Sequence, residues 1–319
     1  MRKLARVLIG VWLVLLSCAL PNRVVPSPTR EPAQRVLIEP DAGLTPIVDA
    51  LNAAQKTVRL EMTGLNERSI LDALKSARGR GVDVRVILGN DPAAQSDLLA
   101  ANISVQPGNP AHPATRAKLI LVDERVALIL TFDLVRAVRA GMLTRDYGVS
   151  TTDPGEVAEL VRVFDADWQR VAPALTQPRI VVTPQNARTR LLDLIDSARK
   201  MLDIQTEELH DAQILDDTIR AVQRGVIVRV LMSRAVSEKD PSAASQDRLK
   251  RAGAFVRFVK TPFIHANLIA VDNARAFVGS QNLTPAALDL NREVGIVVED
   301  TTAVRALAAT FESDWNVGK

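Results

Sequence analysis

The chain has 319 residues, which allows one large domain or two of ordinary size. Its 47% hydrophobic and 24% charged residues exclude a disordered chain, and only 3% aromatic residues disfavour the stacking surfaces that hold single-stranded nucleic acid. The net charge of +3 equals the contribution of Arg2, Lys3 and Arg6 in a first segment without acids. The remainder therefore lacks the positive field of a nonspecific DNA-binding protein.

Residues 1–18 are predicted to be an export signal. A basic start precedes the apolar run Val7–Leu16, which is short for a membrane span. The following Leu15–Cys18 stretch resembles a bacterial lipobox, in which the cysteine is lipidated, although Leu16 replaces the usual small residue. Cys18 is the only cysteine, which excludes an internal disulfide. The alternative is an ordinary cleaved signal with an incidental cysteine.

Residues 19–35 form a proline-rich linker in this interpretation, extended enough to hold a folded body away from a membrane. The alternative is a disordered remnant without a role. Together with the signal, the linker predicts an exported protein of the cell envelope, either membrane-anchored or free in the periplasm or outside the cell.

The rest of the chain is a duplication, with predicted halves at 36–175 and 176–319. A helix-like stretch, a glycine and a buried strand occur at 69–88 and recur at 214–232, with Gly81 matching Gly225 144 residues later. Three further matches follow in order, at 118–123 and 267–272, at 145–149 and 292–296, and at 164–168 and 311–315. Strands that alternate with helices imply an α/β fold. Related halves are expected to meet with equivalent loops at their interface, a common place for a site.

The second half contains the sharpest cluster of polar residues. It consists of His265–Asn267, Asp272, Gly279–Asn282 and Asn291–Glu293. If the first and third groups lie on strands, alternation puts an imidazole, two amides and a hydroxyl on one face. Such a face offers hydrogen-bond donors to phosphate oxygens.

This pattern resembles the phospholipase D superfamily, whose halves each carry His-x-Lys, four residues, Asp, and then Gly-Ser-x-Asn. The second half matches at His265, Asp272, Gly279, Ser280 and Asn282, and the repeat extends the resemblance over about residues 36–319. The resemblance implies two pseudo-symmetric repeats, each a mixed sheet flanked by helices, with one site at their interface. It also implies chemistry without a metal or other cofactor.

Transferred to this chain, the resemblance makes His265 the nucleophile that attacks phosphorus, with Glu293 bound to its other ring nitrogen. Ser280 and Asn282 would bind phosphate oxygens. Asn267, which stands where the family has lysine, would also bind substrate, though without a charge. Asp272 and its counterpart Asp123 would be supporting residues that cap turns or pair with a nearby base.

The first half departs from the pattern. Arg116–Lys118 stands where His-x-Lys belongs, and Leu130–Asp133 replaces Gly-Ser-x-Asn. Lys118 and Arg116 can bind phosphate, but arginine keeps its proton at physiological pH and cannot act as the missing acid. In the internal alignment, Arg116 corresponds to His265 and Asp146 corresponds to Glu293. If Glu293 binds His265, then Asp146 should bind Arg116, which predicts an Arg116–Asp146 ion pair.

Two histidines outside the motif are open to more than one interpretation. His112 lies four residues before Arg116 in a proline-rich loop, either as a displaced acid or, more in keeping with such a loop, as a surface residue. His210 follows Glu207 and Glu208 in a loop after a strand, either at the rim of the site or, as the favoured interpretation, elsewhere on the surface. The three histidines and one cysteine are too scattered for a zinc site.

The sequence thus favours a phospholipase D-type phosphodiesterase or transphosphatidylase that acts on phospholipid headgroups through a phosphohistidine. The first alternative is an inactive protein that binds phosphodiesters or lipids, as the loss of one motif histidine suggests. A nuclease-type phosphodiesterase is a weaker alternative, and no specific nucleic-acid partner is expected. The expected partners are a phospholipid or other phosphodiester substrate and, through Cys18, a membrane.

Overall fold

The computed structural model describes residues 33–89, 91–135, 143–234 and 240–319. The predicted export signal, Cys18 and residues 19–32 of the predicted linker lie outside these ranges. Gln34 and Arg35, which the sequence interpretation assigned to the linker, are instead the first residues of a strand. Within the described residues, no helix combines the length and the apolar character needed to cross a membrane.

The first half consists of seven strands and four helices within its described residues. In chain order they are β1 (Gln34–Glu39), α1 (Thr45–Ala53), β2 (Thr57–Met62), α2 (Arg68–Gly79), β3 (Asp83–Leu88), α3 (Pro92–Ala100), β4 (Ser104–Pro107), β5 (Leu119–Val122), β6 (Val126–Leu130), β7 (Thr144–Thr151) and α4 (Pro154–Gln169).

The second half repeats this order and adds a short strand and a short helix. Its elements are β8 (Ile180–Thr183), α5 (Ala187–Asp196), β9 (Met201–Gln205), α6 (Ala212–Gln223), β10 (Ile227–Met232), α7 (Ala243–Ala252), β11 (Phe255–Phe258), β12 (Phe263–Ile264), β13 (Leu268–Val271), β14 (Arg275–Gly279), α8 (Pro285–Asp289), β15 (Glu293–Val298) and α9 (Thr301–Val317).

Each half forms a mixed sheet with the same strand order. The first sheet runs β1-β7-β6-β5-β2-β3-β4, and the second runs β8-β15-β14-β13-β9-β10-β11. In the first sheet, β3 pairs in parallel with β2 and β4, and in the second sheet β10 pairs in parallel with β9 and β11. The hairpins β5–β6 and β13–β14 are antiparallel. The predicted α/β fold of two repeats is confirmed.

The crossover before each central strand shows how the repeated sequence forms repeated structure. In α2, Ile70, Leu74 and Ala77 are buried at helical spacing. The chain then turns into β3 through Gly81, whose φ of +91° favours glycine over any residue with a Cβ. Gly225, with φ +86°, makes the same turn between α6 and β10.

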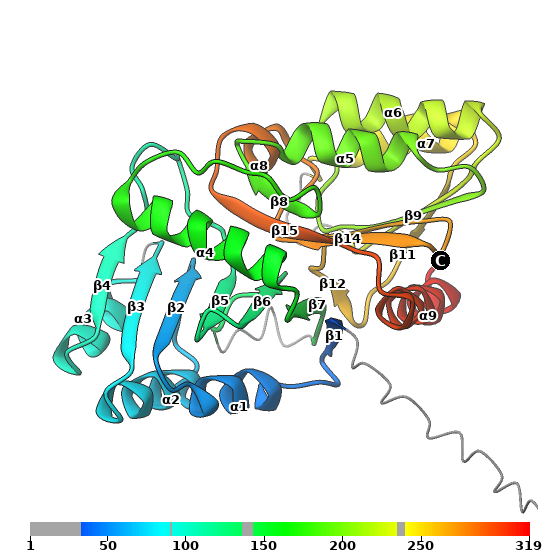
Figure 1. The fold of residues 1–319 in the computed structure, drawn as a ribbon. Coiled ribbons are helices and arrows are strands. Elements are labelled where there is room, and N and C mark those ends of the chain that lie inside the picture. The colour runs from blue at the N-terminus through cyan, green and yellow to red at the C-terminus, as the bar shows by residue number, and fades with distance from the viewer. Residues whose placement is uncertain (1–32, 90, 136–142, 235–239) are drawn as a thin grey trace, which may run out of the picture. The chain divides into compact units, whose positions relative to one another are not determined.

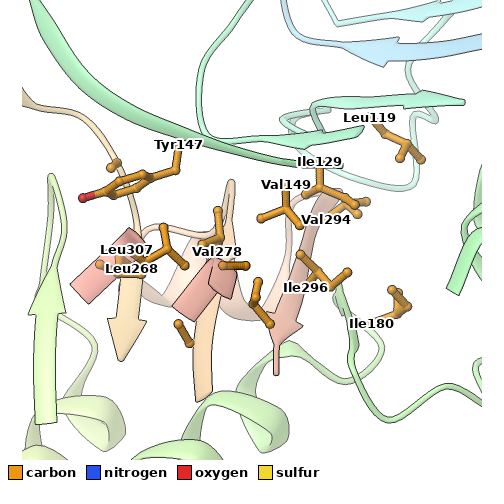
Figure 2. Packing of buried hydrophobic residues seen from close by; sticks show 14 of the residues in the cluster. Leu119, Ile129, Tyr147, Val149, Ile180, Leu268, Val278, Val294, Ile296 and Leu307 are labelled. Atoms are coloured by element: carbon orange, nitrogen blue, oxygen red, sulfur yellow. The ribbon is translucent and has the colours of Figure 1, made fainter. Parts of the chain in front are cut away.

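Three hydrophobic clusters form the layers of the fold. One packs α1, α2 and α3 against the outer face of the first sheet, and a second packs α5 and α6 against the second sheet (Figure 1). The third lies between the two sheets and includes side chains from both halves, among them Ile129, Tyr147, Val278 and Val294 (Figure 2). The halves are thus joined by a shared core whose edge positions the loops described next.

Candidate active site

The segments around His265 and Arg116 each form backbone hydrogen bonds with the opposite half of the chain. Strand β12, just before His265, pairs in parallel with β7 of the first sheet, and the backbone N–H groups of His265 and Ala266 donate to the Arg145 carbonyl at 3.2 and 3.0 Å. In the same way, Arg292 N–H donates to the Ala114 carbonyl and Arg116 N–H to the Arg292 carbonyl, both at 2.8 Å. Each segment therefore lies beside the last strand of the opposite half.

This exchange gives His265 a different partner from the predicted one. His265 Nδ1 lies 2.7 Å from Asp146 Oδ1, and Asp146 also accepts a hydrogen bond of 2.8 Å from the Thr131 hydroxyl. The prediction that Glu293 orients His265 is therefore wrong, because the acid comes from the other half. A carboxylate at Nδ1 fixes the proton there and directs the lone pair of Nε2 outward. The imidazole is 16% exposed.

The predicted Arg116–Asp146 ion pair is wrong for the same reason, since Asp146 binds His265 instead. Arg116 is exposed and lies on the side of Glu293. Burial raises the pKa of the Glu293 carboxyl, while the charges of Lys118 and, to a smaller extent, Arg116 act to lower it. Glu293 accepts a 3.1 Å hydrogen bond from Asn291 Nδ2. Glu293 of the second half thus lies within electrostatic reach of two cations of the first half, Lys118 and Arg116.

The predicted phosphate ligands of the second half lie just beyond strand ends rather than on the strands. Asn267 is buried, and its amide oxygen accepts a 2.7 Å hydrogen bond from the Thr206 hydroxyl. The Ser280 hydroxyl accepts from Val294 N–H at 3.1 Å. Asn282 is half-buried, and its Oδ1 has no hydrogen-bond partner among the described residues. The Asn267 amide oxygen and the Ser280 hydroxyl thus already accept hydrogen bonds from the protein, whereas the Asn282 amide oxygen accepts none from the described residues.

Gly279, the first residue of the same motif, is required by packing. A Cβ there would lie 2.6 Å from the Gly295 Cα on the paired strand β15, too close for any side chain. The close approach of these two backbones brings Ser280 within reach of Val294 N–H. In the first half, Leu130 occupies the corresponding place and packs toward Gly148.

Lys118 is the buried cation of the site. It is 5% exposed, and its Nζ donates to the Arg116 carbonyl at 3.3 Å. Its Nζ also lies 4.0 Å from Asp133 Oδ2, so the carboxylate that replaces a motif asparagine partly neutralises the charge. Lys118 and Arg116 are the kind of side chains that can bind the oxygens of a phosphodiester.

Glu207 is a site residue that sequence reasoning missed. It follows β9, and its Oε2 lies 3.8 Å from His265 Nε2, too far for a hydrogen bond but close enough for a charge interaction. Its position after the carboxyl end of a central strand was the available signal. The Glu207 carboxylate therefore lies beside the ring nitrogen that does not contact Asp146.

Asp272 and Asp123 lie at the hairpin turns, at the opposite ends of their strands from the motif residues. Asp272 accepts hydrogen bonds from the N–H groups of Arg199, Lys200 and Met201, and Asp123 accepts from Gln55, Lys56 and Thr57. Burial alone raises the pKa of each carboxyl, but these donors outweigh it and lower the pKa. Their supporting role is the capping of turns.

Two arginine–aspartate ion pairs also join the halves across the interface. Arg145 Nε lies 2.8 Å from Asp314 Oδ2 of α9, and Arg292 Nη2 lies 2.8 Å from Asp167 Oδ1 of α4. All four residues are buried. The signal was present in two of the repeat matches, 145–149 with 292–296 and 164–168 with 311–315. The sequence alone did not reveal that each arginine pairs with the aspartate of the other half.

The buried environments of these two ion pairs differ. Gln205 Nε2 donates to Asp314 at 3.1 Å, whereas the corresponding residue beside Asp167 is Glu61. Burial raises the pKa of Glu61 well above its usual range, and the neighbouring Asp167 raises it further. Burial also raises the pKa of Asp167 to about 6, against the charge of Arg292. The first half thus has a carboxyl group with a raised pKa where the second half has an amide.

The other two histidines lie in different surroundings. His112 Nδ1 is 3.2 Å from the Leu290 carbonyl, across the interface, and His112 lines a cavity together with Arg116. His210 Nε2 lies 3.6 Å from Glu208, and its side chain is 35% exposed, which fits the expected surface position. Among the described residues, no group of histidine, cysteine and acidic side chains is arranged to hold a metal ion.

These features define a class: an α/β protein of two repeats that exchange segments and place a histidine–carboxylate pair at their interface. A family model described as "cardiolipin synthase, PLD-like domain" matches residues 47–168 and 191–315. The chain belongs to this family, within the phospholipase D superfamily, and contains two such domains.

Individual relatives agree with this assignment. A protein named phospholipase D from Rickettsia felis is 33% identical over 135 residues, which cover 42% of this chain and 64% of that relative. Two solved structures share the fold. A phosphatidylserine synthase from Haemophilus influenzae has a TM-score of 0.68 at 13% identity, covering 90% of this chain and 87% of its own. A polyphosphate kinase from Porphyromonas gingivalis has a TM-score of 0.70 at 19% identity, covering 88% of this chain and 46% of its own.

Proposed function

We propose that the protein is a phospholipase D-type phosphodiesterase or transphosphatidylase that acts on phospholipid headgroups through a phosphohistidine at His265. The observation that supports this most directly is the 2.7 Å contact between His265 Nδ1 and Asp146. It makes Nε2 the basic atom of a partly exposed imidazole, which is the state a nucleophile requires. Lys118 and Arg116 supply charge for the phosphoryl oxygens.

The reaction has two displacements at phosphorus. In the first, His265 Nε2 forms a bond to phosphorus while the bond to the leaving alcohol breaks, and the alcohol oxygen takes up a proton. In the second, water or another alcohol attacks the phosphohistidine, the N–P bond breaks and the attacking oxygen loses its proton. Water gives hydrolysis, whereas an alcohol gives headgroup exchange.

The lipid substrate is proposed on two grounds. The predicted export signal and Cys18 anchor would put the protein at a membrane surface, where phospholipids are the abundant phosphodiesters. The matching family model and the Rickettsia relative are named for enzymes of phospholipids. The proposed location is therefore the cell envelope.

The test uses purified protein lacking residues 1–18 and a phosphatidyl ester of p-nitrophenol, whose good leaving group needs little help from an acid. We expect release of p-nitrophenol that disappears in His265→Ala and persists in His210→Ala, the control histidine. The phosphohistidine should be trapped by acid-free quenching and detected at His265 by mass spectrometry. Equal background from wild type and His265→Ala would reject an enzymatic function.

A second candidate function is binding without turnover, and the first half favours it. Arg116 stands where a second histidine would be needed, and a guanidinium binds phosphate oxygens but does not release its proton at physiological pH. In that case the protein would bind vesicles that contain anionic phospholipid, His265→Ala would bind equally well, and Lys118→Ala would bind more weakly. The absence of p-nitrophenol release together with such binding would select this function.

A further inference from the structure

The proposed reaction leaves a chemical gap in the first half. An alkyl alcohol is a poor leaving group unless its oxygen is protonated as the P–O bond breaks, and a positioned acid contributes about 10²–10⁴-fold. Arg116 stands opposite His265 in the repeat, but a guanidinium does not release its proton at physiological pH. A different group of the first half must therefore protonate the leaving alcohol when the substrate is an unactivated phospholipid.

A cavity of about 320 Å³ lies on the first-half side of the interface, lined by Thr63, Gly89, residues 107–110 and 112–116. Thr63 follows β2 as Glu207 follows β9, 144 residues later. Glu207 faces His265 in the second half, and Arg116 occupies the position of His265 in the first. The cavity is thus the first-half counterpart of the space in front of the nucleophile.

The loop that closes this cavity is fixed by contacts to the second half. Arg292 holds it through backbone hydrogen bonds of 2.8 Å to Ala114 and Arg116. Within the loop, Gly108 packs so closely against Thr115 that a Cβ would lie 2.0 Å from the threonine hydroxyl oxygen. The His112 backbone N–H donates to the Asn109 carbonyl at 3.1 Å. These contacts fix the loop backbone and therefore the position of His112.

The His112 ring is also oriented. Its Nδ1 lies 3.2 Å from the Leu290 carbonyl, which can only accept, so Nδ1 carries a proton and Nε2 is left to exchange one. We propose that His112 is the proton donor and acceptor of the reaction, displaced by four residues from the position where Arg116 stands. This inference rests on the proposed function. His112 is the described histidine of the first half, and it shares its cavity with Arg116.

The proton balance is complete with this residue. In the first displacement, protonated His112 gives its Nε2 proton to the leaving oxygen as the P–O bond breaks and His265 Nε2 binds phosphorus. In the second, neutral His112 takes the proton of the attacking water or alcohol as the N–P bond breaks. Each cycle returns both imidazoles to their starting states.

The surroundings of His112 suit both roles. Burial lowers the pKa of the imidazole, the positive charge of Arg292 lowers it further, and the hydrogen bond to Leu290 partly offsets them. Arg116, in the same cavity, adds a further positive charge. The pKa therefore lies below its ordinary value of 6.5, so the base is the main form at neutral pH and the acid form gains at mildly acidic pH.

The test compares two leaving groups in wild type, His112→Gln and the control His210→Gln. On phosphatidylglycerol, whose leaving group is an alkyl alcohol, His112→Gln should lower kcat about 10²-fold or more. On phosphatidyl-p-nitrophenol, the variant should release one equivalent of p-nitrophenol in a burst at close to the wild-type rate. Slow turnover should follow, with phosphohistidine accumulating, because the second displacement lacks its base.

Three outcomes would overturn the inference. They are an equal loss of the first-turnover rate on both substrates, which indicates a structural role, no loss of that rate on either substrate, and a wild-type enzyme that cleaves the p-nitrophenyl ester but not phosphatidylglycerol. Activity that His265→Ala abolishes would in each case leave the proposed function standing. If wild type and His265→Ala both fail on the p-nitrophenyl ester, the proposed function fails first and the inference falls with it.

Discussion

His265 and Asp146 belong to different halves of the chain, and His265 Nδ1 lies 2.7 Å from Asp146 Oδ1. The contact exists because β12 leaves the second half and pairs with β7 of the first. Asp146 is in turn held by the Thr131 hydroxyl at 2.8 Å. The candidate nucleophile in the second half therefore depends on the first half for the carboxylate that orients its ring.

Asp146→Asn is expected to lower kcat by at least about 10²-fold, because the asparagine amide can donate to Nδ1 and favour the tautomer that protonates Nε2. Glu293→Gln should leave the His265 tautomer unchanged, since Glu293 does not contact the ring. Nitrogen-15 NMR of the imidazole distinguishes the two variants without relying on activity. A tautomer change in Glu293→Gln but not in Asp146→Asn would restore the pairing that the sequence alone suggested.

The fold could be predicted from the sequence because four matches in the same order reveal the duplication, and each match lies on a strand or helix. It also singled out His265, Lys118 and Gly279–Asn282 as candidate site residues, but it expected Ser280 and Asn282 on a strand, whereas β14 ends at Gly279. It failed on the acids, because Asp146 and Glu293 occupy equivalent positions and an internal alignment pairs each with its own half. The choice between them is made by β12, a strand of two residues, Phe263 and Ile264. Such a short exchange leaves no periodic signal in the sequence.

The buried ion pairs escaped prediction for a related reason. Arg145 and Asp314 are far apart in the chain, and the repeat shows only that each has a counterpart. Their partnership arises from the packing of α9 against the first sheet's edge, where Arg145 Nη1 also donates to the Glu39 carbonyl at 2.5 Å. Glu207 was missed because acidic residues after a strand, here Glu207 and Glu208, are an ordinary surface feature until the neighbouring histidine is known.

Asp314→Ala is expected to destabilise the protein by about 3–5 kcal/mol, because it leaves the charge of Arg145 buried without its carboxylate. The Arg145 Nε–Asp314 distance of 2.8 Å and the burial of both residues support a large effect. Urea unfolding provides the measurement. The control is Glu312→Ala on the same helix, whose 50% exposed side chain pairs with Arg229 and should contribute about 0–1 kcal/mol. Equal losses from both variants would contradict the assigned importance of the exchanged pair.

Glu61→Gln is expected to stabilise the protein above neutral pH and to flatten its pH dependence. Burial raises the pKa of Glu61, so the stability that its protonated form confers is fully present below the ordinary pKa of 4.5 and is lost as the pH rises through the raised value. Each unit of that shift costs about 1.4 kcal/mol at high pH. A glutamine can donate to Asp167 without titrating, as Gln205 donates to Asp314 at 3.1 Å.

The measurement for Glu61→Gln is the free energy of unfolding in urea at pH 5 and pH 8. The difference between variant and wild type should grow toward the higher pH. Asp72→Asn, at an exposed position of α2, provides the control and should follow the wild-type profile. Parallel profiles for Glu61→Gln and wild type would show that Glu61 does not hold a proton in the folded chain.

Glu207→Gln should strengthen the binding of an anionic phosphodiester. The Glu207 carboxylate lies 3.8 Å from His265 Nε2, the atom that phosphorus must approach, so it repels the phosphoryl oxygens there. Two like charges about 4 Å apart cost about 1 kcal/mol even in water, which predicts a fall in Kd of roughly fivefold or more. Calorimetric titration with a non-cleavable phosphonate diester measures this, and Glu208→Gln, which removes the neighbouring carboxylate beside His210, serves as the matched control. Weaker binding by Glu207→Gln would mean that the carboxylate helps to hold the ligand, and the repulsion argued here would be wrong.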